Sequence, residues 1–159
     1  MIRVGIGYDA HRFAPGRPLV LGAVGFPGVP GLEGHSDGDV LLHAVCDAVL
    51  GAAGLPDIGT MFPPGDDSYK GVSSLVLLKR VTSAAGERGW AVSQVDSVVV
   101  AERPKIAPHV GRMRENIAAA LGVPPSNVGV KATTTEGMGF EGRREGIGAF
   151  AVALLSASS

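Results

Sequence analysis

SDGDVLLHAVCDAVLGAA, residues 36–53, carries the clearest helical pattern of the sequence. Apolar residues recur at positions 41, 42, 45, 48 and 49, which is the spacing of one face of an α-helix. Ser36 and Asp37 are candidate N-caps, and Gly54 and Pro56 lie where such a helix should end. The pattern therefore predicts a helix over residues 36–53.

Strands and helices alternate on both sides of this helix. Residues 2–6 alternate between apolar and other residues, which predicts a strand, and short hairpin pieces are expected at 19–21 and 25–26. The further expected elements are helix 73–88, strand 92–100, helix 108–121, and strands 127–133 and 147–155. We expect an α/β (α+β) two-layer sandwich, a mixed β-sheet with helices packed on one face, as a single domain over residues 1–159.

The composition favours a soluble protein that buries part of its surface against other subunits. Of the 159 residues, 45% are hydrophobic and only 18% are charged, which is apolar for a small soluble chain. The net charge is −1 and no long basic run occurs, so the sequence-independent attraction to nucleic acid is missing. Any anionic ligand is therefore expected to be small and held by local groups.

The expected location is the cytoplasm. A single cysteine, Cys46, excludes an intrachain disulfide and suits a reducing compartment. The N-terminus lacks the apolar core of a signal peptide. The longest apolar run, AFAVALL at 149–155, is too short to span a bilayer.

The first polar motif is Gly7-Tyr-Asp-Ala-His11, at the end of the first expected strand. Residues two apart on an extended chain point to the same side. Asp9 and His11 can therefore direct a carboxylate oxygen and an imidazole nitrogen at one point, as a divalent metal would need. The Asp-x-His pattern alone is also common by chance.

The second motif is Gly34-His-Ser-Asp-Gly-Asp39, which runs into the helix that carries His43 and Asp47. Positions 39, 43 and 47 are four apart and share one helix face. One interpretation is a solvated polar stripe. The other adds His43 to the Asp/His pair above, because three protein ligands with an open fourth position are the usual plan of a catalytic zinc site. Asp39 or Asp47 then either orients the His43 ring or is simply solvated.

Two further motifs suit a nucleotide. Lys131-Ala-Thr-Thr-Thr-Glu136 offers hydroxyls for phosphate oxygens and a carboxylate for Mg²⁺, although threonines in an edge strand explain the same residues. It is not a Walker A loop, because the glycine and lysine order differs. The segment Ala101-Glu-Arg-Pro-Lys-Ile-Ala-Pro-His109 either grips a base or phosphate through Lys105 or is an ordinary strand-to-helix connection, with His109 structural.

Together and in this order, the motifs resemble the 2-C-methyl-D-erythritol 2,4-cyclodiphosphate synthase family over nearly the whole chain. The resemblance rests on GYDAHRF (7–13), GHSDGDVLLHAVCDAVLGAAGLPDIGTMFP (34–63), AERPKIAPH (101–109) and KATTTEGMGFEGRREGI (131–147). The second and fourth blocks are highly specific. After Phe62-Pro63 the family usually has Asp-Thr-Asp-Pro, whereas this chain has Pro64-Gly65-Asp66-Asp67, which keeps only the second of the two alternating aspartates.

The resemblance implies a homotrimer with active sites between neighbouring subunits. It implies Zn²⁺ on Asp9, His11 and His43, and a second divalent ion, Mg²⁺ or Mn²⁺, placed by Glu136. His35 and Thr134 are implied to stabilise the transition state. The implied substrate-binding positions are Asp9, Ala10, His11, His35, Ser36, Asp57, Ile58, Gly59, Phe62, Asp66, Ala101, Pro104, Lys105, Ile106, Ala107, Thr133, Thr134, Thr135, Glu136, Phe140 and Arg143.

The implied activity is that of a phosphorus–oxygen lyase of non-mevalonate isoprenoid biosynthesis. It would convert 4-diphosphocytidyl-2-C-methyl-D-erythritol 2-phosphate to 2-C-methyl-D-erythritol 2,4-cyclodiphosphate and release CMP. The attacking 2-phosphate needs no general base, because the second pKa of a phosphate monoester is about 6.

Two alternatives use the same residues. One is a zinc-dependent hydrolase of a nucleotide diphosphate, with Glu136 or Asp39 as general base. The other is a non-catalytic, nucleotide-binding trimer. Each alternative explains one motif, whereas the synthase hypothesis explains all four.

Overall fold

A curled, five-stranded mixed sheet organises the computed structural model, which describes residues 1–158. The strands are β1 (Ile2–Leu21), β2 (Val24–Leu32), β3 (Trp90–Val100), β4 (Val128–Thr133) and β5 (Gly146–Ala157). Their order across the sheet is β2-β1-β5-β3-β4. The pair β3 and β4 is parallel, whereas β1 is antiparallel to both β2 and β5, and β3 is antiparallel to β5.

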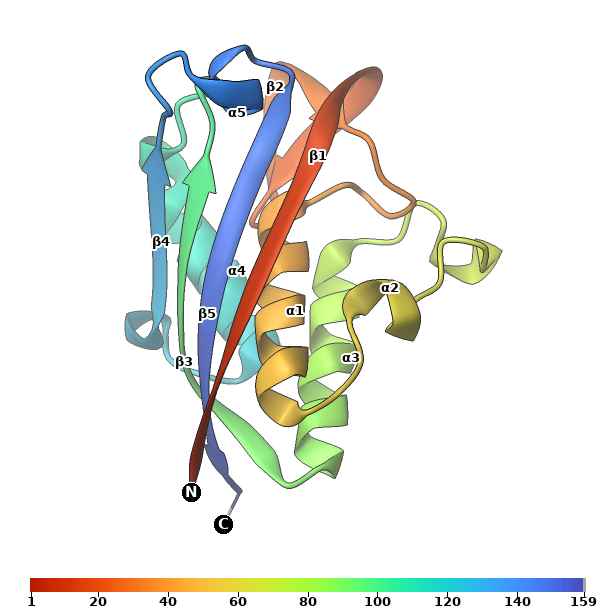
Figure 1. Cartoon of the computed structure of the whole chain (residues 1–159), viewed down its shortest axis with the longest axis vertical. Coiled ribbons are helices and arrows are strands. Elements are labelled where there is room, and N and C mark those ends of the chain that lie inside the picture. Colours follow the sequence, from red (N-terminus) through yellow and green to blue (C-terminus); the bar gives the residue numbers. More distant parts are fainter. Residues whose placement is uncertain (159) are drawn as a thin grey trace.

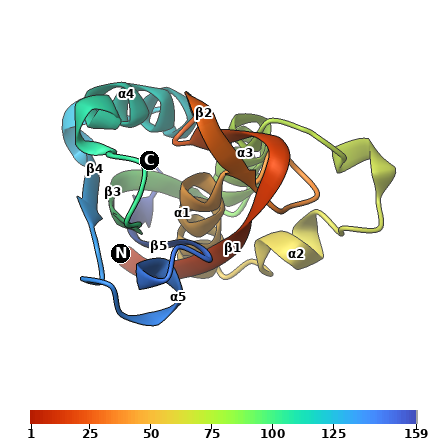
Figure 2. The ribbon, with the colours of Figure 1, turned by 90° about the horizontal axis from the view of Figure 1, so that it is seen from above.

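Three long helices pack on one face of this sheet (Figure 1). They are α1 (Val40–Ala53), α3 (Ser74–Glu87) and α4 (Val110–Leu121), and two single turns, α2 (Ile58–Met61) and α5 (Gly139–Gly142), lie in the connections. Seen from above, β1 curves around one side of α1, and α3 and α4 lie on the other side of α1 (Figure 2). The mixed sheet and the helical layer of the predicted sandwich are therefore confirmed.

The predicted boundaries differ most from the observed ones at α1 and β1. The helix expected from Ser36 begins only at Val40, because Gly38 has a φ of +74° and the chain turns there before Asp39 caps the helix. The strand at 2–6 and the hairpin piece at 19–21 are parts of one long strand, β1. The intervening polar residues stay extended because their backbone pairs first with β5 and then with β2.

Helix α1 lies unusually close to β1. An ideal Cβ placed on Gly7 would lie 1.9 Å from the carbonyl oxygen of Ala44, and one on Gly5 would lie 2.0 Å from that of Ala48. Only glycine allows two backbones to approach in this way. Side chains on almost every side of α1 are buried, as expected for a helix that is apolar all round.

The opposite face of the sheet is exposed, and its part on β1 and β5 is apolar. Its large exposed side chains include Ile2, Val4, Ile6, Tyr8, Phe150 and Val152. Ile6 pairs with Val152 across β1 and β5, and the rings of Tyr8 and Phe150 lie 4.7 Å apart, so these residues form one continuous patch. Within residues 1–158, the helices are all too short or too polar to cross a membrane.

We predict that Gly7→Ala destabilises the protein by about 3 kcal/mol, because the new methyl group must push β1 away from the α1 backbone. Urea unfolding followed by circular dichroism measures this change. Gly25→Ala in β2 is the matched control, since a Cβ there would meet no atom within 4 Å. Equal stability of the two variants would contradict the close approach.

Candidate metal centre

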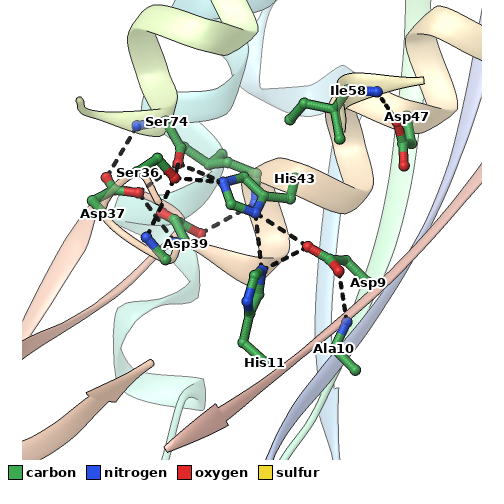
Figure 3. Close-up of polar contacts among 12 residues, drawn as sticks. Asp9, Ala10, His11, Ser36, Asp37, Asp39, His43, Asp47, Ile58 and Ser74 are labelled. Atoms are coloured by element: carbon green, nitrogen blue, oxygen red, sulfur yellow. Dashed lines mark hydrogen bonds and ion pairs between the residues drawn. The ribbon is translucent and has the colours of Figure 1, made fainter. Parts of the chain in front are cut away.

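Three potential metal ligands from β1 and α1 converge on one point (Figure 3). Asp9 and His11 alternate along β1 and face α1, and His43 lies in the first turn of that helix. The Oδ2 atom of Asp9 is 2.8 Å from His11 Nε2 and 3.1 Å from His43 Nδ1. The two ring nitrogens are 3.0 Å apart. The sequence-predicted Asp/His/His set is thus assembled in space.

The chemistry of this triad fits a divalent metal. Burial by itself raises the pKa of Asp9, but hydrogen bonds and positive charge from His11 and His43 outweigh it and hold that pKa well below its usual range. The carboxylate therefore stays available as an anionic ligand. One carboxylate oxygen and two imidazole nitrogens are a common ligand set for zinc and other transition metals.

The remaining ring nitrogen of His43 faces two serines instead of an aspartate. Its Nε2 atom is 2.9 Å from Ser36 Oγ and 3.0 Å from Ser74 Oγ. All three side chains are buried. The suggestion that Asp39 or Asp47 orients this ring is therefore wrong.

Asp39 is a fully buried N-cap. Its carboxylate accepts hydrogen bonds from the backbone N–H groups of Leu42, at 3.1 Å, and of Gly22 and Ala23 in the β1–β2 turn, at 3.0 and 2.8 Å. Burial raises the pKa of Asp39 to about 6, although these three donors favour the charged form. An N-cap side chain turns back to the helix start, so the four-residue spacing did not place Asp39 beside His43.

Asp47 has a local role in the middle of α1. Its Oδ1 atom accepts a hydrogen bond of 2.8 Å from the backbone N–H of Ile58, at the start of α2. Burial raises the pKa of Asp47, while this hydrogen bond opposes the shift. Asp47 thereby fixes α2 next to the triad. Its side chain neither bonds to His43 nor is simply solvated, so both expectations for it are wrong.

We predict that Asp39→Ala lowers the free energy of unfolding by about 3 kcal/mol, because it leaves three backbone donors without their acceptor in a buried position. Thermal and urea unfolding measure the loss. Asp57→Ala, which removes an exposed cap that accepts from Thr60 N at 2.7 Å, should cost only about 1 kcal/mol. A loss at Asp39 no larger than at Asp57 would refute this role.

A pocket of about 210 Å³ opens beside the triad. Of the predicted substrate positions, it is lined by Asp9, His11, His35, Ser36, Ile58, Gly59 and Phe62. Pro64, which stands where the family pattern has aspartate, also lines it. The Nε2 atom of His35 lies 2.9 Å from the backbone oxygen of Asp66, so this histidine contacts the loop in which the sequence departs from the family.

A second pocket, of about 500 Å³, lies where the parallel strands β3 and β4 end. It is lined by the predicted positions Ala101, Pro104, Lys105, Ile106, Ala107, Thr133 and Thr134. The carboxyl ends of parallel strands are a common place for a nucleotide to bind. Thr135 and Glu136 follow directly, and the Glu136 side chain is exposed.

The two pockets lie at different places on the sheet. The triad is carried by β1, and β5 and β3 separate that strand from β4. At a strand spacing of about 4.8 Å, the two strands are roughly 14 Å apart. Figure 1 shows β4 at one side of the molecule and α2, next to the triad pocket, at the other. Most of the predicted site residues therefore form two groups within one chain.

The last predicted positions, Ala10, Phe140 and Arg143, lie near a third hollow. Ala10 and Phe140 line a pocket of about 200 Å³ together with His11. Arg143 forms an exposed ion pair of 3.2 Å with Glu145, which lines the same pocket.

Sequence reasoning missed several residues that hold these groups in place. Ser74 and Asp37 support His43, and Arg17 donates hydrogen bonds of 2.6 Å to the backbone oxygens of Gly34 and Ser36. In the sequence, Ser74 carried only a weak signal, as part of a serine pair at an expected helix start. Contacts between segments this far apart depend on the tertiary fold.

Glu102 is another missed residue. Its Oε1 atom accepts from the backbone N–H groups of Thr135 and Gly137, at 3.1 and 3.3 Å. These two donors flank Glu136, whose φ of +53° is rare for a residue with a side chain. Glu102 thus holds the turn that presents Glu136.

Residues 2–156 match the model of the YgbB family, which is nearly the whole chain. The chain belongs to this family. A YgbB relative named 2-C-methyl-D-erythritol 2,4-cyclodiphosphate synthase, from Symbiobacterium thermophilum, is 60% identical over 153 residues, which cover 96% of this chain and 98% of the relative. The family resemblance seen in the motifs is therefore confirmed.

Solved structures agree with the YgbB assignment. The bifunctional IspDF from Campylobacter jejuni superposes with a TM-score of 0.95 and 41% identity, over 99% of this chain and 42% of that longer chain. A CDP complex of IspF from Plasmodium falciparum gives a TM-score of 0.85 and 32% identity, over 99% of this chain and 97% of the other. A relative with this fold thus binds a cytidine nucleotide.

We predict that His43→Ala lowers the affinity of the YgbB-type centre for Zn²⁺ by more than about 100-fold. Loss of a hydrogen-bond partner of a metal ligand typically lowers metal affinity by about 10- to 100-fold, and loss of the ligand itself should cost more. Competition with a chromophoric chelator measures the affinity. His109→Ala is the control, since His109 packs on Phe26, with ring centres 4.7 Å apart. Unchanged affinity in His43→Ala would refute the centre.

Proposed function

We propose that this protein is a 2-C-methyl-D-erythritol 2,4-cyclodiphosphate synthase, which closes 4-diphosphocytidyl-2-C-methyl-D-erythritol 2-phosphate into a cyclic diphosphate and releases CMP. The observation that carries the proposal is the convergence of Asp9, His11 and His43 beside His35 in a chain of the YgbB family. Its close relatives bear the name of this activity, which belongs to isoprenoid precursor biosynthesis.

The proposed metals are Zn²⁺ on the triad and Mg²⁺ or Mn²⁺ near Glu136. Zn²⁺ held by one carboxylate and two imidazoles would neutralise charge on a phosphate oxygen of the substrate. The exposed carboxylate of Glu136, in a turn held by Glu102, would take the second ion together with diphosphate oxygens, because such ions prefer one or two protein oxygens plus phosphates.

The protein residues would bind and align the two ends of the substrate. The pocket at the ends of β3 and β4 would hold the cytidine against Ala101, Pro104, Lys105, Ile106 and Ala107, with the threonines Thr133, Thr134 and Thr135 along the phosphates. The turn Asp57-Ile58-Gly59 and the loop from Phe62 to Asp66 would face the methylerythritol part, with Ala10, Ser36, Phe140 and Arg143 at the margins.

Alignment would account for much of the rate. His35 and Thr134 would donate hydrogen bonds to the reacting phosphate oxygens, where charge must be shared in the transition state. Holding the 2-phosphate in line with the β-phosphorus makes the attack intramolecular, and effective molarities of such reactions can reach roughly 10⁵ M or more. The nucleophile needs no base at neutral pH.

A homotrimer would join the two separated groups of site residues. The triad pocket and the nucleotide pocket lie at different strands of one chain, so a neighbouring copy is the natural way to place one opposite the other. The exposed apolar face formed by β1 and β5 would supply the contact surface. A cytoplasmic location and a single domain over residues 1–159 stay predictions.

The hydrolase alternative fits less well. It needs a general base beside metal-bound water, and Asp39 and Glu136 were the two candidates. The carboxylate of Asp39 is buried and already bonded to three backbone donors, which leaves Glu136 of a neighbouring copy as the base, and in the synthase proposal that carboxylate is used to hold the second metal ion. A non-catalytic, nucleotide-binding trimer would give the Asp9/His11/His43 triad no catalytic role.

We predict that the purified protein, given the diphosphocytidyl substrate with Zn²⁺ and Mg²⁺, produces two coupled ³¹P resonances of a cyclic diphosphate and an equal amount of CMP. His43→Ala should give less than about 1% of this rate, because metal stabilisation of phosphate charge contributes several kcal/mol to the barrier. A linear hydrolysis product would favour the hydrolase, and tight CDP binding without turnover would favour the binding module.

A further inference from the structure

The hydrogen-bond partners of His43 continue beyond its two serines to a carboxylate. Ser74 donates its hydroxyl hydrogen to Asp37 Oδ1 over 2.5 Å, and its backbone N–H donates to Asp37 Oδ2 over 3.0 Å. Ser74 is the first residue of α3 and is fully buried. A row of contacts thus runs from Asp37 through Ser74 to His43 and the metal triad (Figure 3).

The direction of these hydrogen bonds follows from counting hydrogens. A carboxylate can only accept, and a serine hydroxyl has one hydrogen. Since Ser74 gives that hydrogen to Asp37, its oxygen can only accept from His43, 3.0 Å away. Nε2 of His43 must then carry a hydrogen, and a neutral imidazole so protonated has its lone pair on Nδ1.

The lone pair on Nδ1 of His43 lies on the side of the ring that faces the other two triad residues. Nδ1 of His43 is the ring nitrogen that faces Asp9 Oδ2 and His11 Nε2. The opposite tautomer would place an N–H toward the metal and leave Nε2 facing the Ser74 oxygen, lone pair against lone pair. In a buried site such a mismatch is costly.

Ser36 supports the arrangement but cannot define it alone. Its hydroxyl is 2.9 Å from His43 Nε2 and 3.4 Å from Ser74 Oγ. Because the hydroxyl of Ser36 can either donate or accept, it can bond to either tautomer of the His43 ring. The fixed direction comes from the carboxylate of Asp37, which also accepts from the backbone N–H of Asp39 at 3.1 Å.

We propose that Asp37 and Ser74 are positioning residues that keep the hydrogen of His43 on Nε2 and thereby present Nδ1 to the metal. The proposal deepens the proposed function, because it rests on His43 being a metal ligand. Two residues outside the triad thereby fix which ring nitrogen of His43 faces the metal. Outer partners of metal-bound histidines typically change metal affinity by 10- to 100-fold.

The test compares Zn²⁺ affinity, by chelator competition, among wild type, Ser74→Ala and Asp37→Asn. We expect both variants to bind about 10- to 100-fold more weakly. Asp37→Asn keeps the shape of the side chain but adds an N–H that can donate to Ser74, so it removes the directional constraint. It also keeps the test decisive if Ser74→Ala fails to fold.

Ser73→Ala is the matched control. Ser73 caps the same helix through Leu75 N at 3.3 Å, so this variant weakens the start of α3 without touching the row of contacts. Its Zn²⁺ affinity should stay within about 3-fold of wild type, far less than the effect of losing an outer partner. An equal loss in all three variants would mean that only the stability of α3 matters and would overturn the proposal.

A second readout follows the hydrogen itself. In Zn²⁺-loaded protein with ¹⁵N-labelled histidine, the Nε2–H of His43 should give a slowly exchanging NMR signal, which broadens or disappears in Ser74→Ala and Asp37→Asn. Wild-type affinity and an unchanged signal in both variants would overturn the proposal. Failure of the wild type to bind Zn²⁺ would instead refute the metal centre, and the role of both residues with it.

Discussion

The close approach of β1 to α1 is the constraint on which the site depends. Asp9 and His11 stand on the strand and His43 stands on the helix, so their donor atoms meet only if the two backbones nearly touch. Gly5 and Gly7 provide that closeness, because any side chain there would collide with carbonyl oxygens of α1. Ala151 and Ala153, their partners in β5, add little bulk to the same interface.

Polar groups buried around the start of α1 then fix the individual side chains. Asp39 ties the helix to the β1–β2 turn, and Ser36 and Ser74 hold the ring of His43 from behind. Buried hydrogen bonds of this kind are strong when every partner is satisfied, and they specify one arrangement. The triad is therefore rigid on the side of α1, while the loop near His35 and Asp66 is exposed.

The order of the strands separates the Asp9/His11/His43 triad from the threonine-rich turn that follows β4. Because β5 and β3 lie between β1 and β4, the triad and the threonine-rich turn cannot share one pocket within a chain. The apolar outer face of β1 and β5 gives the molecule a surface suited to neighbouring copies. Topology thus gives a physical reason for the proposed assembly of several copies.

The sequence by itself predicted the three long helices, most strands and the three members of the triad, but not the short helices α2 and α5. Periodicity and the Asp-x-His spacing are local signals, and the motif blocks carried the family. Only the tertiary structure decided that Asp39 is a cap, that Ser74 and Asp37 stand behind His43, and that most of the predicted substrate residues form two groups. These features depend on strand order and on contacts between segments that are distant in the sequence. The spacing of residues along the chain does not encode the direction in which a side chain points once helix and sheet have packed.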